Sequence, residues 1–120
     1  MDKYMILQLR KNEDIKYELF SSLKDLSCMD MKPDINHYEA VFQSSFPPYR
    51  KINELLEDIY MEFNLRLPKD FNGHSLSVSD VIAVKEDNKI RCYYVDSIGF
   101  QELPGFMSQE DYKRITEDVL

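Results

Sequence analysis

The sequence predicts a small α+β fold in which helices pack on one antiparallel or mixed sheet. Short β-rich stretches are interspersed with one strongly amphipathic helical stretch. The 120 residues suit one domain, and 43% hydrophobic with 31% charged residues is an ordinary globular balance. No repeat, low-complexity tract or linker divides residues 1–120, so we expect one domain with the element order β-α-β-α-β-β-α.

The first half of the chain contains two predicted strands and a short helix. Residues 4–9 are apolar-rich and end in a polar turn, which is typical of a strand. A short helix capped by Ser21 or Ser22 is predicted next. Residues 37–42 predict the second strand, and the proline pair at 47–48 prevents a helix from crossing that point.

The clearest predicted element is a helix over residues 51–64. Its apolar side chains recur at helical spacing and form one stripe: Ile52, Leu55, Leu56, Ile59, Tyr60 and Phe63. Acidic residues fall on the opposite side: Glu54, Glu57, Asp58 and Glu62. We therefore expect a helix roughly 20 Å long whose inner face packs on the sheet and whose outer face is strongly negative.

The next predicted elements form a hairpin. Asn72 and Gly73 indicate a turn because both residue types tolerate positive φ. A short turn at Ser79-Asp80 precedes a strand over residues 81–85, and residues 86–89 form the hairpin turn. The β-branched and aromatic residues of 90–98 predict the returning strand.

A last helix is predicted over residues 109–118. Ser108 and Asp111 resemble a capping box, with Asp in the place of Glu. The helix would pack through Tyr112, Ile115 and Val119.

Composition restricts the function classes. With 22 acidic and 15 basic residues the net charge is −7, which opposes nonspecific nucleic-acid binding. The negative charge either serves solubility or competes for a nucleic-acid-binding groove. Cys28 and Cys92 are interpreted as reduced packing residues. The start is not a signal peptide and no stretch approaches the roughly 20 apolar residues of a membrane span, so we expect a cytoplasmic protein that binds no membrane.

The polar residues include types that serve in catalysis and in metal binding. Ser, His and Asp occur together, but there is no GxSxG turn and no glycine-rich phosphate loop. The two histidines, His37 and His74, lie in no zinc-ligand pattern. We therefore expect no catalytic residue, no metal and no cofactor; an enzyme using His74, Asp80 or Asp96 is the minor alternative.

Two segments share an unusual polar pattern, GHSLSVSDV at 73–81 and YYVDSIGF at 93–100. Their polar members either satisfy buried backbone groups around a turn or form a binding surface. These residues are Gly73, His74, Ser75, Ser77, Ser79, Asp80, Asp96 and Ser97. The two segments resemble the YodL-like domain, as do the strand at 4–9 and the helix segment LEDIYMEFN at 56–64. The resemblance covers about residues 4–107 and departs from the family at Ile98, where relatives usually carry Phe.

The resemblance implies a context and leaves the mechanism open. Similar domains occur in bacteria and on phages, plasmids and conjugative elements, and the family offers no catalytic residues to transfer. A small effector that binds a host protein is implied. The residues expected at the interface are acidic: Glu54, Glu57, Asp58 and Glu62, then Glu110, Asp111, Glu117 and Asp118.

Two kinds of host partner follow from this reading. We expect an inhibitor of a CRISPR or restriction effector that does not itself bind nucleic acid. A regulator of a host cytoskeletal or cell-division protein is the alternative, with a more apolar interface.

Overall fold

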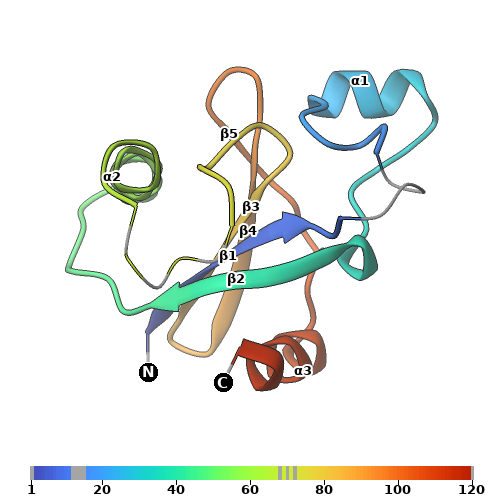
Figure 1. The fold of residues 1–120 in the computed structure, drawn as a ribbon. Coiled ribbons are helices and arrows are strands. Elements are labelled where there is room, and N and C mark those ends of the chain that lie inside the picture. Colours follow the sequence, from blue (N-terminus) through green and yellow to red (C-terminus); the bar gives the residue numbers. More distant parts are fainter. Residues whose placement is uncertain (1, 12–15, 68, 70, 72, 120) are drawn as a thin grey trace.

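The computed structural model describes residues 2–11, 16–67, 69, 71 and 73–119, with the backbone alone for 117–119 (Figure 1). Within these residues the strands are β1 (Lys3–Leu9), β2 (Tyr38–Ser44), β3 (Val81–Glu86), β4 (Lys89–Val95) and β5 (Phe100–Glu102). The helices are α1 (Leu23–Cys28), α2 (Ile52–Leu65) and α3 (Gln109–Val119), and a 3-10 turn covers Ile35–His37. The predicted α+β class and element order are confirmed, with one additional short strand.

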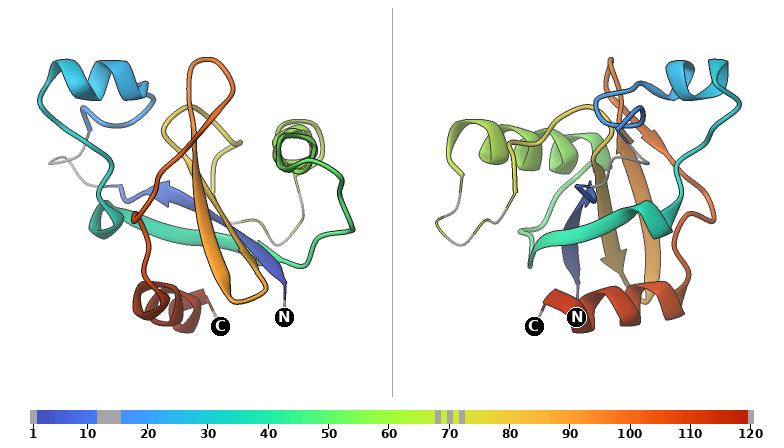
Figure 2. Two further views of the ribbon diagram at one scale, coloured as in Figure 1. Left: turned by 180° about the vertical axis from the view of Figure 1, so that it is seen from behind. Right: turned by 45° about the vertical axis from the view of Figure 1, so that its right-hand side comes forward.

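The strands form one antiparallel sheet in the order β2-β1-β3-β4-β5. Side chains alternate between the two faces of β1, and both faces are buried. Met5 and Leu7 lie in a core with Leu26 of α1 and Tyr112 of α3. The other face packs against α2. Figure 2 shows the same arrangement, with α2 on one side of the sheet and α1 and α3 on the other.

The core under α2 contains the residues that the helical stripe predicts. Leu55, Leu56, Ile59 and Phe63 are buried there against Ile6 and Ile82 of the sheet. Tyr60 is an exception: it is partly exposed, and its ring packs edge-on against Phe100 at 6.2 Å between centroids. The apolar stripe is therefore narrower than the sequence predicts.

Local hydrogen bonds explain where the elements begin and turn. Ser22 caps α1 by accepting from the backbone of Asp25 at 3.1 Å. Asp87 and Asn88 both have positive φ, which suits the tight hairpin between β3 and β4. Ser108 and Asp111 exchange the two bonds of a capping box at 3.0 and 3.1 Å. The three predicted turns and caps are confirmed at these residues.

Two further expectations are wrong, and one strand was not predicted. The strand predicted to reach residue 98 ends at Val95, because residues 96–99 form a turn closed by Asp96 N–H donating to Gly99 O at 3.0 Å. Ile98 is consequently exposed. The chain then returns as β5, whose three residues are too short for a sequence pattern. Cys28 is exposed where α1 ends, so of the two free cysteines Cys92 alone is a packing residue.

Candidate functional site

The polar motif lies at one end of the sheet, where β1 ends and β3 begins. Because Leu7 pairs with Val81, Gln8 and Asp80 are neighbours on the face that α2 covers. Both side chains are buried. Gln8 Nε2 donates to Asp80 Oδ2 at 3.1 Å. This contact places the most buried carboxylate of the motif directly beside an uncharged amide.

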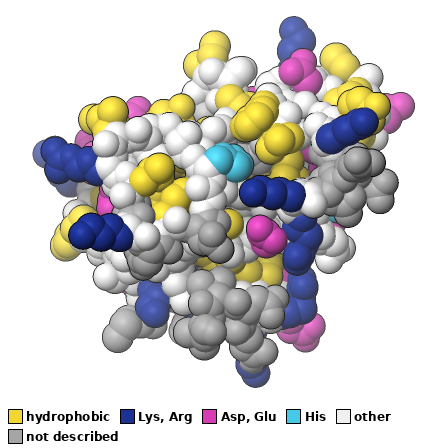
Figure 3. Space-filling view, in the orientation of Figure 1, with side chains coloured by type: hydrophobic (Ala, Val, Ile, Leu, Met, Phe, Trp, Pro, Cys, Tyr) yellow, Lys and Arg dark blue, Asp and Glu magenta, His cyan; other side chains and the backbone are white. Residues whose placement is uncertain are grey.

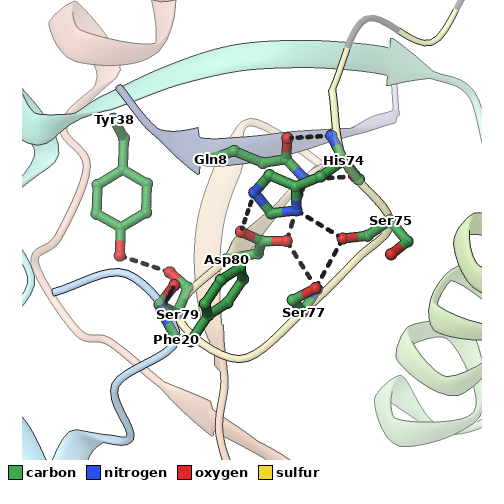
Figure 4. Close-up of polar contacts among 8 residues, drawn as sticks. All are labelled: Gln8, Phe20, Tyr38, His74, Ser75, Ser77, Ser79 and Asp80. Atoms are coloured by element: carbon green, nitrogen blue, oxygen red, sulfur yellow. Dashed lines mark hydrogen bonds and ion pairs between the residues drawn. The ribbon is translucent and has the colours of Figure 1, made fainter. Parts of the chain in front are cut away.

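Gln8 also holds the loop that carries His74 (Figure 4). Its Nε2 donates to the carbonyl of His74 at 2.8 Å, and its Oε1 accepts from the backbone N–H of His74 at 3.2 Å. A Cβ on Gly73 would fall on Gln8 Oε1. The close approach of Gln8 therefore requires a residue without a side chain at this position. Asn72 lies outside the described residues.

Asp80 accepts hydrogen bonds at one oxygen and faces His74 with the other. Ser77 N–H donates to Oδ2 at 2.8 Å. Oδ1 lies 3.8 Å from His74 Nε2, too long for a direct hydrogen bond, and within the described part of the chain neither atom has another partner. Burial raises the pKa of Asp80 to about 8, although the bonds from Ser77 and Gln8 act in the opposite direction.

His74 directs both ring nitrogens toward the protein. Nδ1 lies 2.7 Å from the carbonyl oxygen of Ser75, which assigns it as the protonated nitrogen. Nε2 then presents a lone pair to Asp80 Oδ1. Two lone pairs would repel each other, which favours a proton on the Asp80 carboxyl, in line with the raised pKa of that group.

The serines and Asp96 contact backbone groups. Ser79 is buried with φ of 87°; its Oγ accepts from Phe20 N–H at 3.0 Å, and its carbonyl accepts from Tyr38 Oη at 2.6 Å. Ser77 Oγ donates to the carbonyl of Ser75 at 2.9 Å. Asp96 Oδ1 accepts from Leu23 N–H at 3.2 Å and from the exposed Ser97 at 2.9 Å, which joins the 96–99 turn to the start of α1.

Sequence reasoning missed a second histidine–carboxylate pair. Glu18 is 3% exposed, and its Oε2 lies 2.9 Å from His37 Nδ1. Glu18 follows Tyr17 in a polar-looking segment, so no periodic signal pointed to its burial. Gln8 was detectable, because it is a polar residue within an otherwise apolar strand.

The acidic residues occupy separate surfaces. Glu54, Glu57, Asp58 and Glu62 are all exposed on the outer side of α2. Glu110 and Asp111 lie on α3, which packs on the opposite face of the sheet. Asp111 is engaged in the capping box and lies 3.3 Å from Arg114. The backbone N–H of Ser108 lowers the pKa of Asp111. The side chains of Glu117 and Asp118 lie outside the described residues.

The geometry limits the chemistry. The Ser77 hydroxyl donates its proton to the carbonyl of Ser75. Among the described residues no group of three or more His, Cys, Asp or Glu side chains is placed to hold a metal ion. No helix within the described ranges is both long and apolar enough to cross a bilayer.

The family model of the YodL-like domain matches residues 3–106. The chain therefore belongs to the YodL-like domain family. The match spans β1 to β5 and includes the whole Gln8–His74–Asp80 arrangement, whereas α3 lies outside it. No curated protein and no solved structure matches the chain.

Proposed function

We propose that this chain is a non-enzymatic effector of a phage or mobile element that binds a host protein. Its target in this proposal is a nucleic-acid-directed defence complex of the CRISPR or restriction kind. The protein would act stoichiometrically in the bacterial cytoplasm and occupy a site that normally accepts nucleic acid. The outer face of α2 is the proposed contact surface.

The observation that carries this proposal is the set of unneutralised carboxylates on α2. Glu54, Glu57, Asp58 and Glu62 are exposed, and none has a Lys or Arg nitrogen within 4.0 Å among the described side chains. Eight residues separate the first from the last, about 12 Å along the helix. A phosphate-binding channel lined by Lys and Arg would attract such a row of charges.

The same face also carries apolar side chains, which favour a protein as the partner. Met61 is 55% exposed and Leu65 is 73% exposed. At 100° per residue both fall between Glu57 and Asp58 on the helix circumference. A shallow groove lined by Met61, Glu62, Leu65 and Arg66 lies at this end of α2. Apolar anchors surrounded by charges are typical of protein interfaces.

The non-enzymatic part of the proposal is supported by the orientation of His74. A general base must present a nitrogen to the substrate. Nδ1 of His74 faces the Ser75 carbonyl, and Nε2 faces Asp80. Substrate in solvent would therefore reach neither nitrogen without rearrangement of the loop.

Purified CRISPR and restriction effectors provide the test. We expect one of them to bind the wild type. We expect Glu57→Lys/Asp58→Lys to weaken that complex by about tenfold or more, because two of the four negative charges on α2 become positive. The matched control is Asp2→Lys/Asp25→Lys, which changes the net charge equally at two exposed positions outside α2. Equal affinity of the two double variants would remove the α2 mechanism.

A second candidate is a regulator of a host cytoskeletal or cell-division protein. It is favoured by exposed apolar side chains outside α2, including Tyr17 and Phe20. Under this alternative, expression of the chain would be toxic without any change in phage or plasmid sensitivity. Loss of phage restriction on expression would instead support the defence inhibitor.

A further inference from the structure

The turn before β2 carries a carboxylate and a histidine three residues apart. Asp34 caps the 3-10 turn Ile35–His37, and its Oδ1 accepts from the backbone N–H of Asn36 at 2.9 Å. Its other oxygen, Oδ2, lies 3.7 Å from His37 Nε2. That distance is too long for a hydrogen bond between the two atoms. A carboxylate oxygen and a ring nitrogen therefore face each other across a gap.

Glu18 fixes the ring of His37 from the other side. Its two carboxylate oxygens lie 2.9 and 3.1 Å from His37 Nδ1. Because a carboxylate accepts, this contact assigns Nδ1 as a protonated nitrogen and directs Nε2 toward Asp34. A histidine that binds a metal through one ring nitrogen typically donates the other N–H to a carboxylate, which orients the ring and strengthens the metal bond. Glu18 is placed as such a carboxylate.

The burial of Glu18 calls for positive charge at His37. A carboxylate removed from water is costly unless charge or hydrogen bonds compensate it. Among the described side chains, no Lys or Arg nitrogen lies within 4.0 Å of Glu18. A cation at His37 Nε2, either a metal ion or a proton, would make the ring positive and so stabilise Glu18. The two cations differ in what they require of Asp34, because a metal ion binds both residues.

An ion of the zinc class has a suitable size for the gap. Its bonds to imidazole nitrogen and carboxylate oxygen measure about 2.0–2.2 Å, and tetrahedral geometry sets two such ligands roughly 3.4 Å apart. The observed separation of 3.7 Å is only slightly longer. The Asp34 side chain is 45% exposed, so a small rotation closes the difference without disturbing the core.

The gap opens onto a surface hollow of about 560 Å³. Asp34 and His37 line this hollow together with apolar side chains of two loops, among them Met31, Leu103 and Phe106. Water therefore has access to an ion held between Asp34 and His37. The hollow leaves room for the water molecules that complete its coordination.

The charges around the turn are mixed. Lys32 also lines the hollow and is exposed, while Arg10 lies 3.9 Å from Glu39. In Figure 1 the turn before β2 lies toward the viewer, and Figure 3 shows acidic and basic side chains interspersed over that part of the face. General attraction by an acidic surface therefore does not explain cation binding here, and local coordination has to provide it.

We propose that Asp34 Oδ2 and His37 Nε2 bind a divalent transition-metal ion of the zinc class. Glu18 is the positioning residue, and water fills the remaining coordination positions. Imidazole favours zinc and its neighbours over Mg²⁺ and Ca²⁺, which take oxygen ligands. The histidine spacing did not predict this site, because its second ligand is an aspartate and its positioning residue lies 19 residues from His37.

This site is separate from the proposed contact surface on α2. Ile35, within the same turn, packs against the core on the side of α1 and α3, whereas α2 covers the other face of the sheet. Loss of metal binding would therefore leave the α2 proposal standing, and failure of the α2 variants would leave the metal site standing.

Titration of the whole chain with Zn²⁺ alone tests the proposal by calorimetry and by NMR of the two histidine rings. We expect saturable one-to-one binding that shifts the His37 ring signals, leaves those of His74 in place and retains the proton on His37 Nδ1. Lack of saturable binding up to about 1 mM Zn²⁺, as for a His37 that holds a proton between its two carboxylates, would overturn the proposal. A shift of His74 in place of His37 would overturn it as well.

Two variants separate the ligand from the positioning residue. Asp34→Asn keeps an oxygen for the cap but removes the charged ligand, and we expect it to raise the Kd for Zn²⁺ by about tenfold or more. Glu18→Gln should raise Kd by about tenfold and increase the population of the Nε2-protonated tautomer of His37 in the NMR spectrum. Asp34 is half-exposed, so its variant should fold even if Glu18→Gln does not.

Controls are provided by groups near the turn that are not part of the site. Asp25→Asn removes an exposed carboxylate of α1, and Cys28→Ser removes an exposed thiol that also binds zinc. Both should leave Kd unchanged. Equal Kd values for the wild type and Asp34→Asn would refute the assignment, and loss of binding in Cys28→Ser would transfer the ion to the thiol and refute it too.

Discussion

Replacing Asp80 by Asn is expected to remove a pH dependence of stability. In the folded protein the Asp80 carboxyl is buried and its pKa is raised from 3.8 to about 8. The folded state therefore binds this proton more tightly than the unfolded chain. The free energy of unfolding should fall as pH rises from about 4 through about 8. The stabilisation by this proton is fully present below the pKa of the carboxyl in the unfolded chain. It is lost as the pH rises through the pKa of the carboxyl in the folded protein.

The size of the change in stability follows from the pKa shift of Asp80. Each pH unit within this window changes the free energy of unfolding by at most ~1.4 kcal/mol. For a folded pKa of about 8, the loss between about pH 6 and pH 8 is ~2 kcal/mol.

Asparagine suits the site because it reproduces the protonated carboxyl. Its oxygen can occupy the position of Oδ2 and accept from Ser77 and Gln8. Its amide can occupy the position of Oδ1 and face the lone pair of His74 Nε2. Asp80→Asn should therefore fold, and should gain stability relative to the wild type as pH rises. Asp80→Ala lacks both groups and should lose about 2–3 kcal/mol at about pH 6. This deficit should shrink toward pH 8, because the variant also lacks the titrating carboxyl.

Urea denaturation followed by circular dichroism, at about pH 6 and about pH 8, measures these differences. The gap between Asp80→Asn and the wild type should widen by up to ~2 kcal/mol across this interval. The alanine variant controls for loss of packing. Parallel pH profiles for wild type and Asp80→Asn would refute the assignment of a retained proton to this carboxyl.

Further predictions concern packing and thiol accessibility. Gly73→Ala should lower stability by about 1–3 kcal/mol, because its Cβ would displace Gln8; an unchanged urea midpoint would contradict this. Phe63→Ala should cost about 3–5 kcal/mol in the same assay, since the ring is fully buried; a loss below ~1 kcal/mol would show a collapsible core. A thiol reagent should label Cys28 in the native protein and Cys92 only after denaturation, because Cys92 is buried and its pKa is raised to about 12; rapid native labelling of both would exclude this packing.

Elements defined by local patterns were predictable from the sequence. The helical stripe of α2 and the serine cap of α1 arise from residues close in the chain, where spacing alone determines which side chains share a face. The turn between β3 and β4 and the capping box of α3 are likewise local. Family membership follows from the same kind of information, because the YodL-like motifs are contiguous segments.

The site itself was decided by tertiary structure. The polar motif was visible from residue 73 to residue 80, but its main partner, Gln8, lies 72 residues from Asp80 and reaches it through the pairing of β1 with β3. Burial of Glu18 and exposure of Tyr17 follow from contacts with His37, Ser79 and Tyr94. Residues far apart in the chain meet only when the sheet forms, so spacing along the sequence could determine the elements and could not determine these contacts.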